Sequence, residues 1–500
     1  MPVETELKLR IAPEHMARLR RHPMLKTLES GHAVTRKLIN IYFDSPGLDL
    51  QRHQMALRLR RTGGKWLQTL KGGGGVEAGL HSRNEWETPV TGEALDLDAL
   101  KASGGKLPPG VKKKLRPVFT TDFTRSMRQL KFEGAEIELC MDSGAIIAGK
   151  KSRPISELEL ELKNGEPQQL FKLALALLDI VPLEVEHASK AEYAYRLYRG
   201  DRPAAIKARL PRLDPALGIA GALRNMIAAC LLHVQANVPG AIGDHDEEYL
   251  HQVRVGLRRL RVVLAMANKY RQDPELDELR QQVSGLCNRL GRARDWDVFV
   301  TQTLAPISAQ FPDHAGLRSV MRASRKNRKL QNSDMRAILA APDFSRLLLR
   351  LGCWMQGGYW QESEGDAAAS LPDFARRMLE KRSKQVGRVG RQLAAGDEGQ
   401  LHELRIACKK LRYGTEMFGS LFGTDKTRRH VAALSRLQDI MGILNDITVA
   451  RRLLDEMGDT AKSSATRALI LGWLEHGQAR RMVELKNSWK RFSGQAAFWD

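Results

Sequence analysis

Cysteines, aromatic residues and long apolar runs are scarce in this sequence of 500 residues. The five cysteines are an odd number, widely spaced and without a CxxC pair, so neither a disulfide framework nor a zinc site is indicated. The longest uncharged stretch, residues 225–243, contains His233 and Pro239, which favours a buried helix and a loop over a membrane span. The N-terminus shows no apolar segment with a small-residue cleavage site. We therefore expect a cytoplasmic protein with reduced thiols and no membrane partner.

Acidic residues are also in deficit, because 58 Asp and Glu face 80 Lys and Arg, for a net charge of +22. Residues 1–200 hold 32 basic and 25 acidic residues, whereas residues 201–500 hold 48 and 33. Most of the excess lies in the second part, where we expect a polyanionic partner. Aromatic residues make up only 6% of the chain and no nucleic-acid recognition motif is present, so sequence-specific nucleic-acid binding is not expected.

Two kinds of periodicity divide the chain. Residues 1–200 contain short alternating runs broken by Gly and Pro, which predict antiparallel strands, with one apolar helix over 169–181. Residues 201–216 are rich in Pro and Arg, follow neither period and are interpreted as a linker. Residues 217–500 have helical periodicity, so the predicted fold class is α+β, with a strand domain followed by an all-α domain. The glycine run 72–75 opens no helix and is interpreted as a mobile loop.

An internal repeat is the most specific feature of the helical part. The pattern H-x-x-R-[VI]-x-x-[RK]-[RK]-L-R occurs at residues 251–261 and again at 402–412. The pattern L-x-x-x-[LM]-G-x-x-x-D occurs at 286–295 and again at 437–446. Both recurrences have the same offset of 151 residues. This predicts a tandem duplication over about 217–355 and 372–500, joined by a polar loop.

The predicted strands of the first part have unusual charged faces. Residues two apart share a face of a strand, so Glu4, Glu6 and Lys8 point together. Other faces are purely acidic, as in ELELE at 157–161, or purely basic, as in LRLR at 57–60. A single such strand is best read as a solvated face, but like charges side by side repel unless opposite charges lie between them. Carboxylates suit Mg²⁺ or Mn²⁺ and arginines pair with phosphate, so strands closed around one interior would hold a metal-bound polyphosphate.

These strands carry an ordered series of motifs. ExExK at residues 4–8 is followed by YFDSPGLDL, ALRLRR, TLKG, TDFTR and SELELELK. In this order the series resembles the CYTH (triphosphate tunnel metalloenzyme) family over residues 1–200. The resemblance implies an eight-stranded antiparallel barrel whose tunnel binds a triphosphate with Mg²⁺ or Mn²⁺. It also implies hydrolysis by positioned water, without a covalent nucleophile.

The resemblance assigns roles to individual residues of this chain. The implied metal ligands are Glu4, Glu6, Glu159 and Glu161. The implied triphosphate-binding bases are Lys8, Arg58, Arg60, Lys71, Arg83, Arg125 and Lys190. The catalytic set is taken as Glu4, Glu6, Lys8, Glu85 and Glu87. Further charged candidates on the same predicted faces are Glu136, Glu138, Asp142 and Glu157, with Arg36 as an additional base.

The repeated helical motif places basic residues in a stripe. At helical spacing His251, Arg254, Arg258 and Arg261 share one face with no acid to offset them, and the second copy repeats the arrangement. Most charge stripes are solvated faces, but uncompensated like charge on a helix is destabilising without a counterion. We therefore predict an anion-binding surface. Its predicted residues are His251, Arg254, Arg258, Arg259, Arg261, His402, Arg405, Lys409, Lys410 and Arg412.

This duplicated unit resembles the CHAD domain, a helical module found behind CYTH domains and associated with inorganic polyphosphate, over residues 217–500. Together the two resemblances imply an inorganic triphosphatase that converts tripolyphosphate to diphosphate and phosphate, with a polyphosphate-binding helical domain, in the cytoplasm or on polyphosphate granules. Relatives of the same fold act on thiamine triphosphate or nucleotides, or cyclise ATP, and the charged residues alone do not choose between these activities. A polyphosphate-binding scaffold with little turnover is a further alternative.

Overall fold

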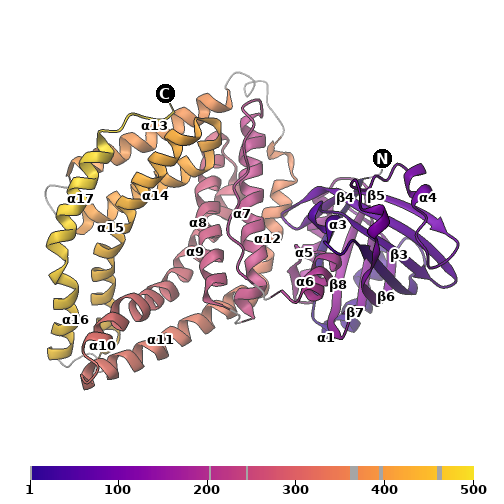
Figure 1. The fold of residues 1–500 in the computed structure, drawn as a ribbon, viewed down its shortest axis with the longest axis horizontal. Helices are drawn as coiled ribbons and strands as arrows, with labels where there is room; N and C mark the ends of the chain where they lie inside the picture. Colours follow the sequence, from indigo (N-terminus) through magenta and orange to yellow (C-terminus); the bar gives the residue numbers. More distant parts are fainter. Residues whose placement is uncertain are drawn as a thin grey trace. The chain divides into compact units, whose positions relative to one another are not determined.

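The structure is a computed structural model that describes residues 3–201, 204–243, 246–360, 370–392, 398–458 and 464–499. The chain divides into two compact units. The first consists of Met1–Lys207, Leu231–Val253 and Leu339–Tyr359, and the second of Ala208–Cys230, Arg254–Ile338 and Trp360–Asp500. The strands belong to the first unit, and the described elements of the second are helical (Figure 1). The predicted loop between the repeats falls largely on residues 361–369, outside the described residues.

A closed antiparallel barrel dominates the first unit, which confirms the predicted eight-stranded tunnel. Its strands are hydrogen-bonded in the order β5-β4-β3-β2-β6-β7-β8-β1, and β1 also pairs with β5, which closes the sheet (Figure 1). A short strand, β9, extends the sheet beside β1. The bounds are β1 Val3–Ile11, β2 Val34–Asp44, β3 Ala56–Thr62, β4 Lys65–Glu77, β5 Leu80–Val90, β6 Arg116–Phe132, β7 Ala135–Ala148, β8 Lys151–Asn164 and β9 Leu183–Val185.

Helices cover apolar strand faces on the outside of this barrel. Leu158 and Leu160 of β8 are fully buried, and α5 packs on β1 and β8 with a buried apolar face of its own. The predicted helix at 169–181 is confirmed as α5. Because these leucines point away from the interior, the intervening charged residues of β8 point into it. The helices of this region are α1 Pro13–Arg20, α2 Pro23–Leu28, α3 Asp49–Arg52, α4 Leu97–Ala102, α5 Gln168–Leu178 and α6 Lys190–Arg199.

The glycine run 72–75 is not a loop, so that interpretation is wrong. It lies within β4, where the pairing register with β5 shifts between Gly72 and Gly75. Gly74 has a φ of +77°, and a Cβ at this position would lie 1.8 Å from the carbonyl oxygen of Ser82. A side chain cannot fit there, so the run forms a bulge that lets the two strands continue together.

Corresponding helices carry the two copies of the sequence repeat. α8 (Glu247–Tyr270) and α14 (Glu398–Phe418) begin at residues 247 and 398, which is the repeat offset of 151. α9 (Pro274–Val298) and α15 (Thr424–Glu456) carry the second motif. The other described α-helices are α7 Ile219–Ile242, α10 Ala305–Gln310, α11 Ala315–Ala340, α12 Pro342–Met355, α13 Leu371–Gly390, α16 Ser464–His476 and α17 Gln478–Ser493. Short helical segments of other types are η1 Lys112–Lys114, η2 Phe299–Leu304, η3 Gly358–Trp360 and η6 Gly419–Leu421.

Among the described helices, α7 alone is long and apolar enough to cross a membrane by composition, with a mean hydropathy of 1.3 in its most apolar window. However, 61% of that window is buried within the protein, and the helix contains Pro239. Core helices of soluble proteins have the same composition, so α7 is weak evidence for a membrane span.

Asp44 and Tyr195 attach α6 to the barrel. The buried carboxylate of Asp44 accepts hydrogen bonds of 2.7–3.0 Å from three backbone N–H groups within residues 45–51. It also accepts a hydrogen bond of 2.9 Å from the hydroxyl of Tyr195. This contact holds the helix that begins at Lys190.

We expect Tyr195→Phe to lower the free energy of unfolding by about 1.5–3 kcal/mol, because a buried charged acceptor loses one partner. Tyr198→Phe, at an exposed site on the same helix, should change it by less than about 0.5 kcal/mol. Urea unfolding of the full chain, followed by circular dichroism, measures both. Equal stabilities of the two variants would contradict this role of Tyr195.

Candidate functional site

A cavity of about 900 Å³ lies inside the barrel. Every residue that the sequence assigns to the tunnel as metal ligand, base or catalytic acid lines this cavity, together with Arg36 and Glu138. Asp142 and Glu157 are buried, whereas Glu136 is exposed. The assigned residues that line it are Glu4, Glu6, Lys8, Arg58, Arg60, Lys71, Arg83, Glu85, Glu87, Arg125, Glu159, Glu161 and Lys190.

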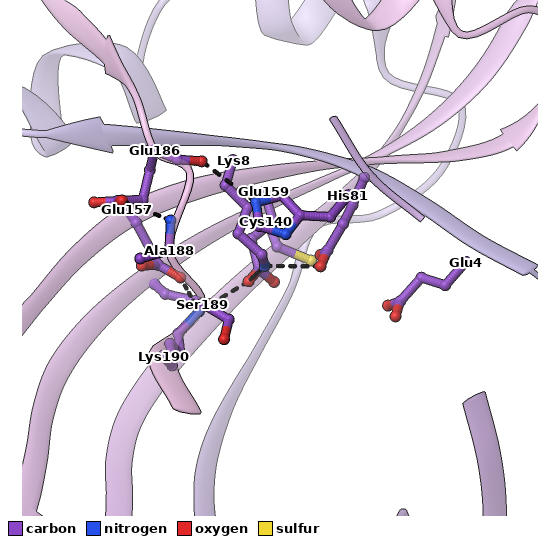
Figure 2. A network of polar contacts seen from close by, with 12 residues as sticks. Glu4, Lys8, His81, Cys140, Glu157, Glu159, Glu186, Ala188, Ser189 and Lys190 are labelled. Carbon is purple, nitrogen blue, oxygen red and sulfur yellow. Dashed lines mark hydrogen bonds and ion pairs between the residues drawn. The ribbon is translucent and has the colours of Figure 1, made fainter. Parts of the chain in front are cut away.

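A buried ion-pair cluster forms one part of this interior. Lys190, the first residue of α6, lies 2.6 Å from Asp142 and 3.0 Å from Glu159. Arg125 lies 2.6 Å from Asp142 and also contacts Glu159, which Lys8 reaches from β1. Figure 2 shows Lys8 and Lys190 at this cluster, with Glu4 standing apart from it. The members are Lys8, Arg125, Lys190, Glu6, Asp142, Glu157 and Glu159.

The bases of this cluster largely neutralise its acids. Burial raises the pKa of Glu157 to about 7, whereas for Glu159 the attraction of Lys190 and Lys8 outweighs burial and holds its pKa well below the usual range. The carboxylates of Asp142, Glu157 and Glu159 lie within 4.8 Å of one another, close enough to hold a cation. Their charges are already offset by the bases, so in this arrangement they form an ion-pair network.

Arg58 and Arg60 of β3 form a second group of buried bases, of which Arg60 is the less compensated, because interactions with Tyr42, Glu85 and Glu4 outweigh burial and raise the pKa of Arg58. Arg58 lies 3.7 Å from the carboxylate of Glu85, and its Nε and Nη2 atoms are buried without a hydrogen-bond partner. Arg60 has no carboxylate within 4 Å in the described part of the chain. Burial, together with Arg58 and Arg125, lowers the pKa of Arg60 to about 10. Buried guanidinium groups in excess of nearby acids favour a polyanionic ligand.

Glu4, Glu138 and Glu161 supply carboxylates outside the ion-pair cluster. Burial raises the pKa of Glu161, and the charges of Glu4 and Glu138 raise it further against the opposing effect of Lys163. Glu4 contacts Lys71, which also lies 3.3 Å from Glu85. Mutually repelling carboxylates are stabilised by a divalent cation with oxygen ligands. Carboxylate oxygens of this kind suit a divalent metal ion.

Sequence reasoning missed three inward-facing residues, Asn40, Tyr42 and His81. Asn40 and Tyr42 share the face of Arg36 on β2, so the parity of that strand could have identified them. Burial and the neighbouring Lys8 lower the pKa of His81 to about 3, which keeps this fully buried imidazole neutral. His81 shares the face of Arg83 and Glu85 on β5, so strand parity could have identified it as well.

Basic residues from both repeats converge in the second unit. The Nε atoms of Arg258 on α8 and of Arg405 and Arg412 on α14 are buried without a hydrogen-bond partner. The pKa of Lys409 is lowered to about 7 by burial and by the positive charges of Arg405, Arg258, Arg412 and Arg254. Asp446, on α15, attracts Arg405 but leaves the group positive. The two stripes thus face one another instead of forming two separate surfaces.

Other members of the predicted anion surface have different surroundings. Arg259 donates a hydrogen bond of 2.8 Å to Glu416, an acid outside both motifs that also lies 3.5 Å from Arg412. Lys410 is exposed, and His402 lines a separate cavity of about 260 Å³ near the start of α14. Arg261 and His251 are half-buried on α8. Glu416 therefore offsets part of a charge that the motifs alone leave uncompensated.

Comparisons with known proteins agree with the barrel. Residues 2–195 match the CYTH domain family. This region is 34% identical over 194 residues, or 39% of the chain, to the inorganic triphosphatase of Haemophilus influenzae, and the chain spans only about half (54%) of that protein. An uncharacterized protein of Mycobacterium tuberculosis is 27% identical over 482 residues, covering 89% of this chain and 87% of that protein.

The helical part has matches of its own. Residues 225–455 match the CHAD domain family. The crystal structure of the CHAD domain from the plant Ricinus communis is 30% identical, covers 57% of this chain and 96% of that chain, and superimposes with a TM-score of 0.51. The chain therefore belongs to the CYTH and CHAD families, with a CYTH domain followed by a CHAD domain.

Proposed function

We propose that the tunnel hydrolyses inorganic triphosphate to diphosphate and phosphate. The observation that carries this proposal is the cavity of about 900 Å³, in which incompletely neutralised arginines and grouped carboxylates line one enclosed space. The similarity of the barrel region to an inorganic triphosphatase supports this substrate over an organic triphosphate.

The bases bind the triphosphate and hold its reacting bond in line. Arg58 and Arg60 donate to phosphate oxygens, and Lys8 and Lys190 add charge beside them; the remaining proposed substrate contacts are Lys71, Arg83 and Arg125. Glu85 and Glu87 position the attacking water, and Glu87 is itself oriented by a 3.2 Å hydrogen bond from the hydroxyl of Thr69. Positioning and charge stabilisation account for most catalysis of phosphoryl transfer.

Mg²⁺ or Mn²⁺ is the proposed cofactor. Glu4, Glu6, Glu159 and Glu161 would hold it. Glu4 and Glu161 lie outside the ion-pair cluster, whereas Glu6 and Glu159 would exchange contacts with the bases of that cluster for the ion. Burial and the charges of Glu4 and Glu138 raise the pKa of Glu161. When bound, such an ion neutralises phosphate charge. Glu6 and Glu161 are cross-strand neighbours, so β1 and β8 can present them together.

We also propose that the helical domain binds inorganic polyphosphate. The converging cations Arg254, Arg258, Arg405 and Lys409 support this, because a linear polyanion can contact both repeats at once. The outer residues Arg259, Arg261, Lys410 and Arg412 and the histidines His251 and His402 would extend the contact. Binding of this kind would place the triphosphatase on polyphosphate granules in the cytoplasm.

Glu4→Gln should reduce phosphate release from tripolyphosphate by at least about 100-fold, because a proposed metal ligand loses its charge. Release is measured with Mg²⁺, with Mn²⁺ and with EDTA, and ATP, thiamine triphosphate and long-chain polyphosphate serve as competing substrates. Glu14→Gln, at an exposed position of α1, is the matched control and should behave as wild type. An active Glu4→Gln enzyme, or cyclic AMP as the product from ATP, would refute the proposed reaction.

Lys409 makes polyphosphate binding sensitive to pH. Its pKa is about 7 in the free protein, and bound phosphate raises it, so affinity is full below pH 7 and falls by up to about tenfold per pH unit above it. Arg258 occupies the equivalent position of the first repeat, so an arginine is a suitable replacement for Lys409. Lys409→Arg should stay charged and abolish the loss of polyphosphate affinity between pH 7 and 8.5. Titration calorimetry at constant ionic strength tests this, and parallel pH profiles of the two proteins would exclude it.

A further inference from the structure

Asn40 connects three strands inside the barrel and has no role in the reaction proposed above. It lies on β2, directly opposite Arg60 on β3 and Thr121 on β6 in the strand register. Its side chain is fully buried, as is that of Thr121. Two hydrogen bonds join the three residues: Arg60 Nε donates to Asn40 Oδ1 at 3.0 Å, and Asn40 Nδ2 donates to Thr121 Oγ1 at 2.9 Å.

The chemistry of the three groups fixes their orientation. A guanidinium group can only donate hydrogen bonds, so the amide oxygen of Asn40 must face Arg60 and the amide nitrogen must face Thr121. The hydroxyl of Thr121 accepts that second bond and thereby holds the amide. Because Arg60 is engaged through Nε, its two terminal nitrogens are left for another acceptor. Arg60 lines the cavity.

The neutrality of Asn40 matters as much as its geometry. Other bases of the interior are held by carboxylates: Lys190 by Asp142 and Arg125 by Asp142 and Glu159. Arg60 is held by an amide instead, in a region where burial and the positive charges of Arg58 and Arg125 lower its pKa more than the more weakly acting Glu87 raises it. An amide orients the guanidinium without cancelling its charge, whereas an aspartate of the same shape would form an ion pair with it.

We infer that Asn40, held by Thr121, is a positioning residue that orients Arg60 toward the cavity and preserves its charge for an oxygen of the triphosphate. The inference rests on the proposed triphosphatase function and deepens it. It distinguishes Arg60 from the bases whose charges are neutralised in the ion-pair cluster. Arg60 is already oriented for the triphosphate in the empty cavity.

The test compares Asn40→Asp with Asn164→Asp, which adds the same charge at an exposed position of β8. KM and kcat are measured for tripolyphosphate with Mg²⁺, and the Kd of tripolyphosphate is measured without metal by calorimetry. Asn40→Asp should raise KM and Kd at least about tenfold, as expected for one neutralised phosphate contact, with kcat changed less than about threefold. Asn164→Asp should match wild type in all three constants.

Thr121 provides a second test that leaves Asn40 in place. Thr121→Val removes the hydroxyl that holds the amide and should raise KM, while Thr121→Ser keeps the hydroxyl and should restore the wild-type value. Unchanged KM and Kd in both Asn40→Asp and Thr121→Val would overturn the inference while wild-type turnover leaves the triphosphatase proposal standing. A wild-type protein that neither binds nor hydrolyses tripolyphosphate would overturn both.

Discussion

Compensation of buried charge is the constraint on which the barrel depends. Its strands turn charged residues inward and leucines outward, so many ionised groups lose contact with bulk water, at a cost of several kcal/mol for each unpaired ion. Lys8, Arg125 and Lys190 offset the acids of one region, and the contact of Tyr195 with Asp44 helps to hold α6, which begins at Lys190. Asp44 of the YFDSPG segment therefore supports the interior indirectly, whereas Tyr42 of the same segment lines the cavity itself.

Incomplete compensation is what distinguishes a binding site from a charged core. If every inward-facing base had a carboxylate partner, the cavity would be stable but would have little affinity for anions. Arg60 departs from this balance, and its lowered pKa reflects burial first and then the repulsion of Arg58 and Arg125. A bound polyanion such as the proposed triphosphate would offset this repulsion. Repulsion among buried bases therefore lowers the stability of the empty barrel and raises its affinity for a polyanion.

The alternating charges predicted antiparallel strands with charged faces, and the resemblance to the CYTH family implied that these strands close into a barrel with those faces inside. Parity could not show which acid meets which base. The triple contact of Lys190 depends on where a helix outside the sheet begins, and the role of Asn40 depends on the register of three strands. The glycine run was misread because a bulge and a loop have the same composition, and only the close approach of Gly74 to Ser82 separates them.

The helical domain also contains basic residues that nearby acids only partly neutralise. Its repeats bring cations together, yet the nearby acids are engaged individually: Asp295 accepts from Arg452 at 2.6 Å, and Glu416 contacts Arg259 and Arg412. The part of this surface that the structure describes holds no group of adjacent carboxylates comparable to that of the barrel. An excess of cations over acids favours a polyanion as the ligand of such a surface. These differences support the proposal that the barrel, where acids and bases line one cavity, carries out hydrolysis and that the repeats retain a long polyanion.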